Sequence, residues 1–232
     1  MILLNVDLGE MPDEPEALYE HAHLANVACG GHAGDEASMR RAVELCIRHG
    51  TRIGAHPSYP DRAGFGRRPM ALSPSGLGAT VAEQCVWLVR VARSLDRPVG
   101  FVKPHGALYH AAREHAEVAA ALVAGAREAL GGGVTFVGPA RGELAEHVRR
   151  AGLAYAREGF ADRATRADGT LVPRTEPGAL IADPAQAAER ARTLASSGEV
   201  DTICVHGDTP GAVAIARAVR AALGGAPPDA GG

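Results

Sequence analysis

The chain lacks the sequence features that define several classes of protein. No apolar segment in its 232 residues reaches the roughly 18 positions that a membrane span requires. The formal net charge of -3 provides no electrostatic attraction to nucleic acid or to an anionic membrane. The chain opens on an apolar run, without the basic segment and longer hydrophobic stretch of a secretory leader. We therefore expect a cytoplasmic protein that has neither nucleic acid nor a membrane as a partner.

The four cysteines give no sign of a disulfide framework. No two of them stand in a Cys-x-x-Cys arrangement, and unpaired cysteines in a cytoplasmic protein of this size are more often thiols than bridges. We interpret Cys46, Cys85 and Cys204 as core residues and set Cys29 apart as the exception.

Three common ligand-binding motifs are also absent. No Gly-x-Gly-x-x-Gly follows the first apolar run, which argues against an open dinucleotide-binding sheet. No Gly-x-x-x-x-Gly-Lys-[Ser/Thr] segment is present to cradle phosphates, so the position of any nucleotide stays open. No His-Glu-x-x-His pair marks a metal site.

The remaining composition and its periodicity predict the fold. With 46% hydrophobic and 22% charged residues, the chain is typical of one globular domain with a sizeable core. Short β-branched runs alternate with longer amphipathic segments, and the expected strands are residues 2–6, 24–28, 52–55, 99–102, 134–137, 153–156 and 202–205. About seven such units predict an α/β fold, a single-domain (β/α) barrel that is incomplete or distorted. We place it at residues 1–223 and expect a flexible tail at 224–232.

Several helix boundaries are signalled chemically. Asp35 is suited to cap a helix that stops at Gly50, whereas Ser73 and Asp183 each precede a proline at an expected first helical position. Within the helix that follows Ser73, Trp87 lies among apolar neighbours, and we expect it in the core.

Ionisable residues stand where four of the expected strands end, namely Asp7 and Glu10, His56, Lys103 and His105, and His206 and Asp208. In α/β folds the carboxyl ends of the strands converge on one face, so side chains distant in sequence come together there. This pattern predicts an active site in which all of these residues are catalytic candidates. His32 joins them from the glycine-rich turn after the second strand.

Each candidate also has a structural interpretation. Asp7 could be a core carboxylate that binds a helix N-terminus. His32 could serve only the tight turn that its neighbouring glycines permit. Asp208 could form an oriented pair with His206, or it could cap the helix that starts near Pro210. Both kinds of interpretation stay open at the level of the sequence.

Two expected loops, residues 57–72 and 158–182, carry further candidates. Loops of more than about 12 residues in compact domains are often lids or binding segments. Arg67 and Arg68 in the first loop could clamp a substrate carboxylate or a nucleotide phosphate, or they could be solvated surface. Asp162 and Arg163 in the second loop are candidates for the same binding role, with an internal ion pair as the alternative.

Several segments of the chain together resemble a known family. They are NVDLGE at 5–10, ANVACGGHAGD at 25–35, GAHP at 54–57 continuing to GFGRR at 64–68, VKPHGALY at 102–109, FADR at 160–163, DGTLVPR at 168–174 and CVHGDTPGAV at 204–213. In this order, and over nearly the whole chain, they are similar to the LamB/YcsF family. The resemblance implies a barrel related to those of glycoside hydrolases and deacetylases. It also implies ATP-dependent opening of 5-oxo-L-proline to L-glutamate, in a 5-oxoprolinase complex with two other subunits, B and C.

The chain departs from the family pattern at a few positions, which are Leu3, Met11, Gly31, Gly159 and Thr165. The polar residues at the strand ends are retained. We therefore expect the departures to affect loop packing and substrate fit more than the chemistry.

Ring opening of a lactam suggests roles for the candidates. Amide resonance makes the carbonyl a poor electrophile, and phosphorylation of its oxygen by ATP would prepare it for attack by water. The roles are Lys103 for a phosphate or the substrate carboxylate, Asp7 or Glu10 with His105 for activating water, and His56 or His206 for protonating the departing nitrogen. ATP would bind through the cationic side chains of this chain or on a partner protein of the complex.

Other functions and partners stay open. Asp7, His32 and His56 are residue types that a divalent metal ion uses, so a stand-alone metal-dependent amide or carbohydrate deacetylase is an alternative. A non-catalytic binding subunit is a second alternative, and the sequence also leaves a homo-oligomer open.

Overall fold

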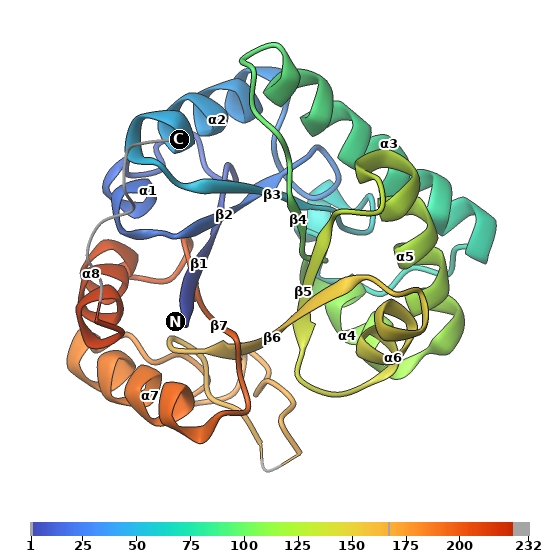
Figure 1. Ribbon diagram of the computed structural model, residues 1–232. Helices are drawn as coiled ribbons and strands as arrows, with labels where there is room; N and C mark the ends of the chain where they lie inside the picture. Colours follow the sequence, from blue (N-terminus) through green and yellow to red (C-terminus); the bar gives the residue numbers. More distant parts are fainter. Residues whose placement is uncertain (1, 167, 225–232) are drawn as a thin grey trace.

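Seven parallel strands form a closed barrel in the computed structural model, which describes residues 2–166 and 168–224. The strands are β1 (Leu3–Leu8), β2 (Leu24–Ala28), β3 (Arg52–His56), β4 (Phe101–Val102), β5 (Thr135–Pro139), β6 (Ala154–Phe160) and β7 (Thr202–His206). Figure 1 shows them around the centre of the molecule with the helices outside. The predicted fold class is confirmed. The barrel is closed because β7 pairs with β1 as well as with β6.

Helices follow the strands and cover the barrel from outside (Figure 1). They are α1 (Ala17–His21), α2 (Glu36–His49), α3 (Pro74–Arg93), α4 (Gly106–Glu114), α5 (Ala116–Leu130), α6 (Glu143–Arg150), α7 (Pro184–Ser197) and α8 (Ala212–Ala222). The predicted caps are confirmed at Asp35, Ser73 and Asp183, each of which accepts a hydrogen bond from a backbone N–H of the first turn. Gly50 ends α2 in the left-handed conformation, with φ of 67°.

The apolar core lies between the strands and the helices. The core residues of α3 form one stripe along the helix. This stripe contains Leu77, Val81 and Leu88, which are spaced so that they lie on the same helix face. The prediction for Trp87 is wrong, because its side chain falls beside this stripe and is 38% exposed. Its ring lies over Gly30, where an added Cβ would come within 2.6 Å of a ring carbon.

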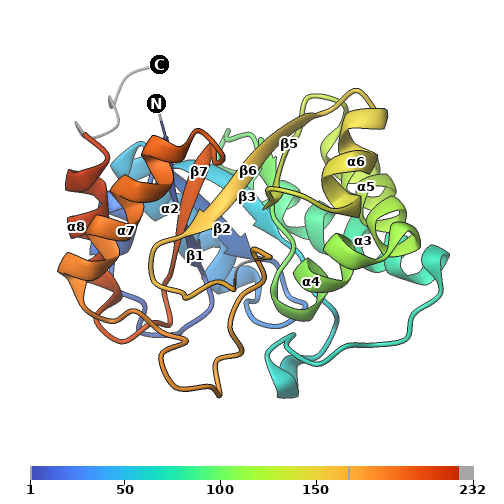
Figure 2. The ribbon, with the colours of Figure 1, turned by 90° about the horizontal axis from the view of Figure 1, so that it is seen from below.

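Two long loops extend from the same end of the barrel, as Figure 2 shows for the segments after β3 and after β6. The first contains a short 3-10 helix, Arg62–Gly64. The second begins at residue 161 rather than at 158, because β6 continues to Phe160. Two isolated bridges, Arg163 with Leu180 and Thr165 with Leu171, fold this second loop back on itself.

The fold does not test the predicted flexible tail or the predicted cytoplasmic location. Residues 225–232 of the expected tail lie outside the described residues. Among the residues that are described, none of the helices has the length and apolar character needed to cross a bilayer. The cytoplasmic location stays a prediction.

Candidate active site

A buried lysine lies inside the barrel, among acceptor groups from three strands. The Lys103 ammonium lies 2.9 Å from Asp7 Oδ1 and 2.8 Å from Glu158 Oε1. It also donates to Asn5 Oδ1 at 3.2 Å and approaches the sulfur of Cys204 at 3.0 Å. The residue is only 2% exposed. Its donors are engaged within the protein, and its contact with Asp7 holds that carboxylate in place. The contact of Lys103 with a substrate anion stays a prediction.

Charge outweighs burial in this network. Burial disfavours the Asp7 carboxylate, but the charges of His56 and Lys103 hold its pKa well below the usual value. Burial likewise disfavours the Lys103 ammonium, but the Asp7 carboxylate helps to hold its pKa well above the usual value. The second carboxylate oxygen, Asp7 Oδ2, lies 3.4 Å from His56 Nε2 and 3.9 Å from His206 Nε2. Asp7 is therefore an ionised group that faces two imidazoles.

The predictions from sequence missed several members of this network. Asn26 donates from its amide nitrogen to both Asn5 Oδ1 and Asp7 Oδ1, at 2.8 Å each. Glu158 binds Lys103 from β6. Asn5 stands two positions before Asp7 on the same strand, and alternate residues of a strand point to the same side. This spacing was a signal available in the sequence.

The cysteines follow the prediction only in part. All four are free and buried. Cys29, set apart from the sequence, has its pKa raised to about 12 by burial. Cys204 lies in the core as predicted, and its thiol also lies against Lys103.

Three histidines and one glutamate converge beside Asp7. Glu10 Oε1 lies 2.9 Å from His32 Nε2 and 3.3 Å from His105 Nδ1. The same oxygen lies 3.8 Å from His56 Nε2. Each of the four side chains is at most 7% exposed. Burial lowers the pKa of His32 to about 4 and also lowers that of His105.

The structure groups a different set of residues from the three that the sequence suggested for a metal ion. His32 and His56 are present as expected, but Glu10 and His105 complete the group. Asp7 belongs to a second group with Cys204 and His206. We refer to Glu10, His32, His56 and His105 as the histidine cluster.

The loop after β3 covers the histidine cluster. The Phe65 carbonyl oxygen lies 3.0 Å from His105 Nε2, and the Phe65 ring meets the ring of His32 edge-on. Gly66 adopts φ of 64°, and a Cβ at this position would lie 2.9 Å from the Cβ of His32. Glycine is therefore required where the loop backbone approaches the cluster.

The structure explains why glycine stands at position 31, where the chain departs from the family pattern. A Cβ on Gly31 would lie 2.3 Å from Gln84 Oε1 and 2.4 Å from Ser58 Oγ. Gln84 fills this space because its amide group binds both the N–H and the carbonyl of Ser58. The Gln84 side chain thus occupies the room next to Gly31.

His206 is oriented by Asp162. Its Nδ1 lies 3.1 Å from both carboxylate oxygens, and its backbone N–H donates to Asp162 Oδ2. Thr209 donates its hydroxyl to the same carboxylate at 2.6 Å. The sequence offered Asp208 as the partner of His206 or as a helix cap, and the structure shows neither. Helix α8 begins after Gly211 without a side-chain cap.

Asp208 instead joins two arginines above the pocket. Arg174 binds both of its carboxylate oxygens at 3.0 Å, and Arg67 binds one of them. Arg163 lies nearby and donates to the carbonyls of Val172 and Ala179 rather than to Asp162. The Asp162–Arg163 ion pair, which was the alternative to a binding role for these residues, is therefore not formed.

These contacts leave a surplus of positive charge near the pocket. We call Arg67, Arg163 and Arg174 the arginine cluster, and all three line the pocket. A single carboxylate, Asp208, forms ion pairs with two of them, Arg67 and Arg174. Burial and the neighbouring arginines lower the pKa of Arg163. Arg68 pairs with Asp61 and does not line the pocket.

The pocket between the loops has a volume of about 900 Å³. Asp7, Lys103 and His206 line it, together with the arginine cluster. The structure therefore brings Asp7, His56, Lys103, His105 and His206 to one pocket at the carboxyl ends of the strands. Glu10 and His32 do not line the pocket, but Glu10 contacts His105 and His32 contacts Glu10.

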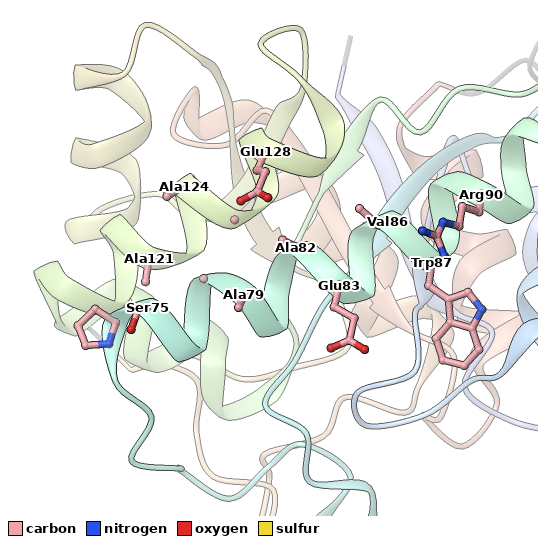
Figure 3. Close-up of a pocket in the computed structure, with 13 residues that line it drawn as sticks. Ser75, Ala79, Ala82, Glu83, Val86, Trp87, Arg90, Ala121, Ala124 and Glu128 are labelled. Carbon is pink, nitrogen blue, oxygen red and sulfur yellow. The ribbon is translucent and has the colours of Figure 1, made fainter.

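A second cavity of about 960 Å³ lies on the outside of the barrel, between α3 and α5. Figure 3 shows that small side chains such as Ala79, Ala82 and Ala121 line much of it. Its charged residues include Glu83 and Glu128, and none of the predicted site residues lies there. It is similar in size to the first pocket, but it lacks the convergent acid–base groups of the first.

The fold and the site define the class: a (β/α)-barrel protein with ionisable groups gathered at the carboxyl ends of its strands, where barrel enzymes carry their active sites. Within this class, the chain belongs to the LamB/YcsF family, whose model matches residues 2–227. The predicted family is thereby confirmed.

Similar proteins extend over almost the full chain. A protein of Methylococcus capsulatus, named as the A subunit of 5-oxoprolinase, is 45% identical over 237 positions, covering 95% of this chain and 91% of that protein. Its namesake from Streptomyces griseus is 46% identical over 241 positions, covering 96% of each. The crystal structure of a lactam utilization protein from Thermus thermophilus superposes with a TM-score of 0.89 at 37% identity, again covering 96% of each chain.

Proposed function

We propose that this chain is the A subunit of an ATP-dependent 5-oxoprolinase, which hydrolyses 5-oxo-L-proline to L-glutamate as ATP is hydrolysed to ADP and phosphate. The names of the similar proteins support the proposal. The structural observation that carries it is that His206, oriented by Asp162, faces Asp7 in a pocket that three arginines also line. A small anionic lactam requires such cations for its carboxylate and acid–base groups for its amide bond.

The acid–base roles follow from the contacts. Asp7 Oδ1 is held by Lys103 and Asn26, so Oδ2 is the oxygen directed toward His56 and His206. In the proposed reaction Asp7 accepts the proton of the attacking water, whose oxygen forms a bond to the ring carbonyl carbon. His206 donates a proton from Nε2 to the ring nitrogen as the carbon–nitrogen bond breaks.

ATP activates the carbonyl in this scheme. Transfer of the γ-phosphoryl group to the lactam oxygen makes the carbon electrophilic, and that phosphoryl group finally leaves as phosphate. Because Lys103 is engaged within the barrel, the arginine cluster is the part of this chain that we propose for the anions. We propose that ATP binds where this pocket meets the partner subunits B and C, since an activated intermediate must be shielded from bulk water.

Reconstitution tests this function. The isolated chain should release no glutamate from 5-oxo-L-proline and ATP, whereas addition of both cognate subunits should produce glutamate and phosphate in equal amounts. Mixtures in which one of the three proteins is omitted serve as controls, and both products are measured in each. Ring opening by the isolated chain with ATP would contradict the need for partners.

The histidine cluster favours a second candidate function, a metal-dependent amide or carbohydrate deacetylase that acts without ATP. The same assay separates the two. Turnover by the isolated chain in the absence of ATP, lost on addition of a chelator, would identify the deacetylase-type hydrolase.

A further inference from the structure

Arg163 is a buried cation of the pocket that is held by neutral groups. The residue is 5% exposed and lines the pocket. Its Nε donates to the carbonyl oxygen of Ala179 at 3.4 Å, and its Nη2 donates to that of Val172 at 2.7 Å. It forms no ion pair with any residue that the structure describes. Its positive charge therefore has no counter-ion in the described part of the chain.

The two carboxylates that act on Arg163 electrostatically, Asp162 and Asp208, are engaged with other groups. Asp162 binds both the ring and the backbone N–H of His206. Asp208 forms ion pairs with the other two members of the arginine cluster. A buried charge without a partner is costly in free energy. An anion that enters the pocket would supply the missing partner of Arg163.

The unused donors of Arg163 suit a carboxylate. A guanidinium group presents its N–H donors in a planar fork that matches the two oxygens of a carboxylate. The N–H groups of Nη1, and one N–H of Nη2, have no acceptor among the residues that the structure describes. The contacts to the carbonyls of Val172 and Ala179 hold the side chain in place. The fork is thus fixed before a ligand arrives, which reduces the entropic cost of binding.

Charge and enclosure favour a carboxylate over a phosphate at this residue. The single negative charge of a carboxylate balances the single charge of Arg163, whereas the higher charge of a nucleotide phosphate chain calls for several cations. The side chains of Arg67 and Arg174 are more exposed, at 42% and 23%. A small substrate enclosed by the pocket therefore meets Arg163, and the more exposed arginines are left for larger anions.

Apolar side chains line the same pocket next to His206. Tyr109 and Phe160 pack together with Leu171 against them, and all three line the pocket. The Phe160 ring stacks on the His206 ring, with the ring centroids 5.7 Å apart. Leu171 directly precedes the residue whose carbonyl binds Arg163. The pocket therefore offers one ligand a cation, an apolar surface and an imidazole, which suits a cyclic amide with a carboxylate on its ring.

We propose that Arg163 binds the carboxylate of the substrate and thereby restricts this site to lactams that carry one. The assignment rests on the proposed function and names the residue that determines specificity within it. In 5-oxo-L-prolinamide a neutral amide replaces the carboxylate of 5-oxo-L-proline. This analogue would leave Arg163 buried without a counter-ion, so it should bind poorly.

The ratio of two affinities tests the assignment. The three-subunit complex is titrated by calorimetry without ATP, once with 5-oxo-L-proline and once with 5-oxo-L-prolinamide. We expect the wild type to prefer the acid by about 100-fold, as two charge-assisted hydrogen bonds provide. Arg163→Gln, which removes the charge, should bind the two ligands about equally. Arg163→Lys, which keeps the charge but not the fork, should retain part of the preference.

Arg166→Gln is the matched control. Arg166 belongs to the same loop and also lines the pocket, but its guanidinium pairs with Glu176. The preference for the acid should be unchanged in this variant. The ratio also separates recognition from a structural role. If Arg163 served only to hold the loop, Arg163→Gln would weaken both ligands together and leave their ratio unchanged.

The assignment is overturned if the wild type binds both ligands equally, or if Arg163→Gln keeps the wild-type preference. A higher KM for ATP in Arg163→Gln, with that preference unchanged, would assign the residue to phosphate instead. No binding of 5-oxo-L-proline by the wild-type complex would overturn both the assignment and the proposed function. A complex that prefers the acid through Arg163 but releases no glutamate with ATP would support the assignment and reject the ATP-coupled reaction.

Discussion

His206 and Asp162 illustrate how one contact sets an ionisation state in this pocket. Burial alone would lower the pKa of His206, but the adjacent Asp162 carboxylate outweighs burial and raises it. An acid works only while it is protonated, so its activity is present below its pKa and is lost as the pH rises through it. Asp162 is therefore a positioning residue that also extends the working range of His206 upward.

Asp162→Asn tests this interpretation because it keeps the side-chain shape and removes the charge. The pKa of His206 should fall, so the alkaline limb of the kcat/KM profile of the reconstituted complex should move to lower pH. Thr209→Val, which removes a hydrogen bond to the same carboxylate but no charge, should move the limb much less. An alkaline limb that stays in place in Asp162→Asn would show that the contact serves structure alone.

His23 connects a single residue to acid stability. Its Nδ1 accepts the backbone N–H of Leu4 at 2.9 Å, and burial lowers its pKa to about 4. In the unfolded chain the value is near 6.5. Because the folded pKa is the lower one, protonation favours the unfolded state. The contribution of His23 to stability is thus present above about pH 6.5 and is lost as the pH falls toward 4.

We expect His23→Gln to weaken this acid dependence, since glutamine retains an acceptor oxygen but does not titrate. The measurement is the free energy of unfolding in urea at pH 7.5 and pH 5, for the wild type and the variant. The difference between the two pH values should be smaller in the variant. Equal differences in both proteins would contradict the assignment.

At the scale of elements, the backbones of α3 and α5 approach each other closely. A Cβ on Gly125 of α5 would lie 2.2 Å from the carbonyl oxygen of Gly78 on α3. Both groups belong to the backbone, so neither can rotate away as a side chain would. The two glycines therefore determine how closely these helices pack. They lie beside the second cavity, which Figure 3 shows.

Gly125→Ala should push the helices apart. Overpacking of this kind costs about 1–3 kcal/mol and outweighs the roughly 1 kcal/mol by which alanine favours a helix over glycine. A fall of several degrees in melting temperature is expected. Gly132→Ala is the control, because a Cβ there meets nothing within 4 Å. If both variants melt like the wild type, the helix contact is not as close as described.

At the scale of the whole molecule, barrel closure assembles the pocket. Asp7 on β1 is in register with Asn26 on β2 and with His206 on β7. This second pairing exists only because the last strand returns to the first. Above the strands, Asp208 joins Arg67 from the loop after β3 to Arg174 from the loop after β6, so three distant segments enclose one space.

The sequence by itself determined the elements of this protein. Alternation of apolar segments predicted all seven strands, and Asp35, Ser73 and Asp183 predicted where helices begin. It also placed the candidate residues at strand ends. These features depend on interactions between residues a few positions apart, such as a side chain that binds the N–H groups of its own first turn, so a linear pattern contains them.

Only the tertiary structure decided which side chains are partners. The sequence directed Lys103 at a substrate and offered Asp208 as one possible partner of His206. In the barrel, Lys103 contacts Asp7 and Glu158, and His206 contacts Asp162. Partners of this kind come from strands and loops far apart in the chain. Their meeting depends on strand register, barrel closure and the paths of the long loops, none of which is encoded in the spacing of neighbouring residues.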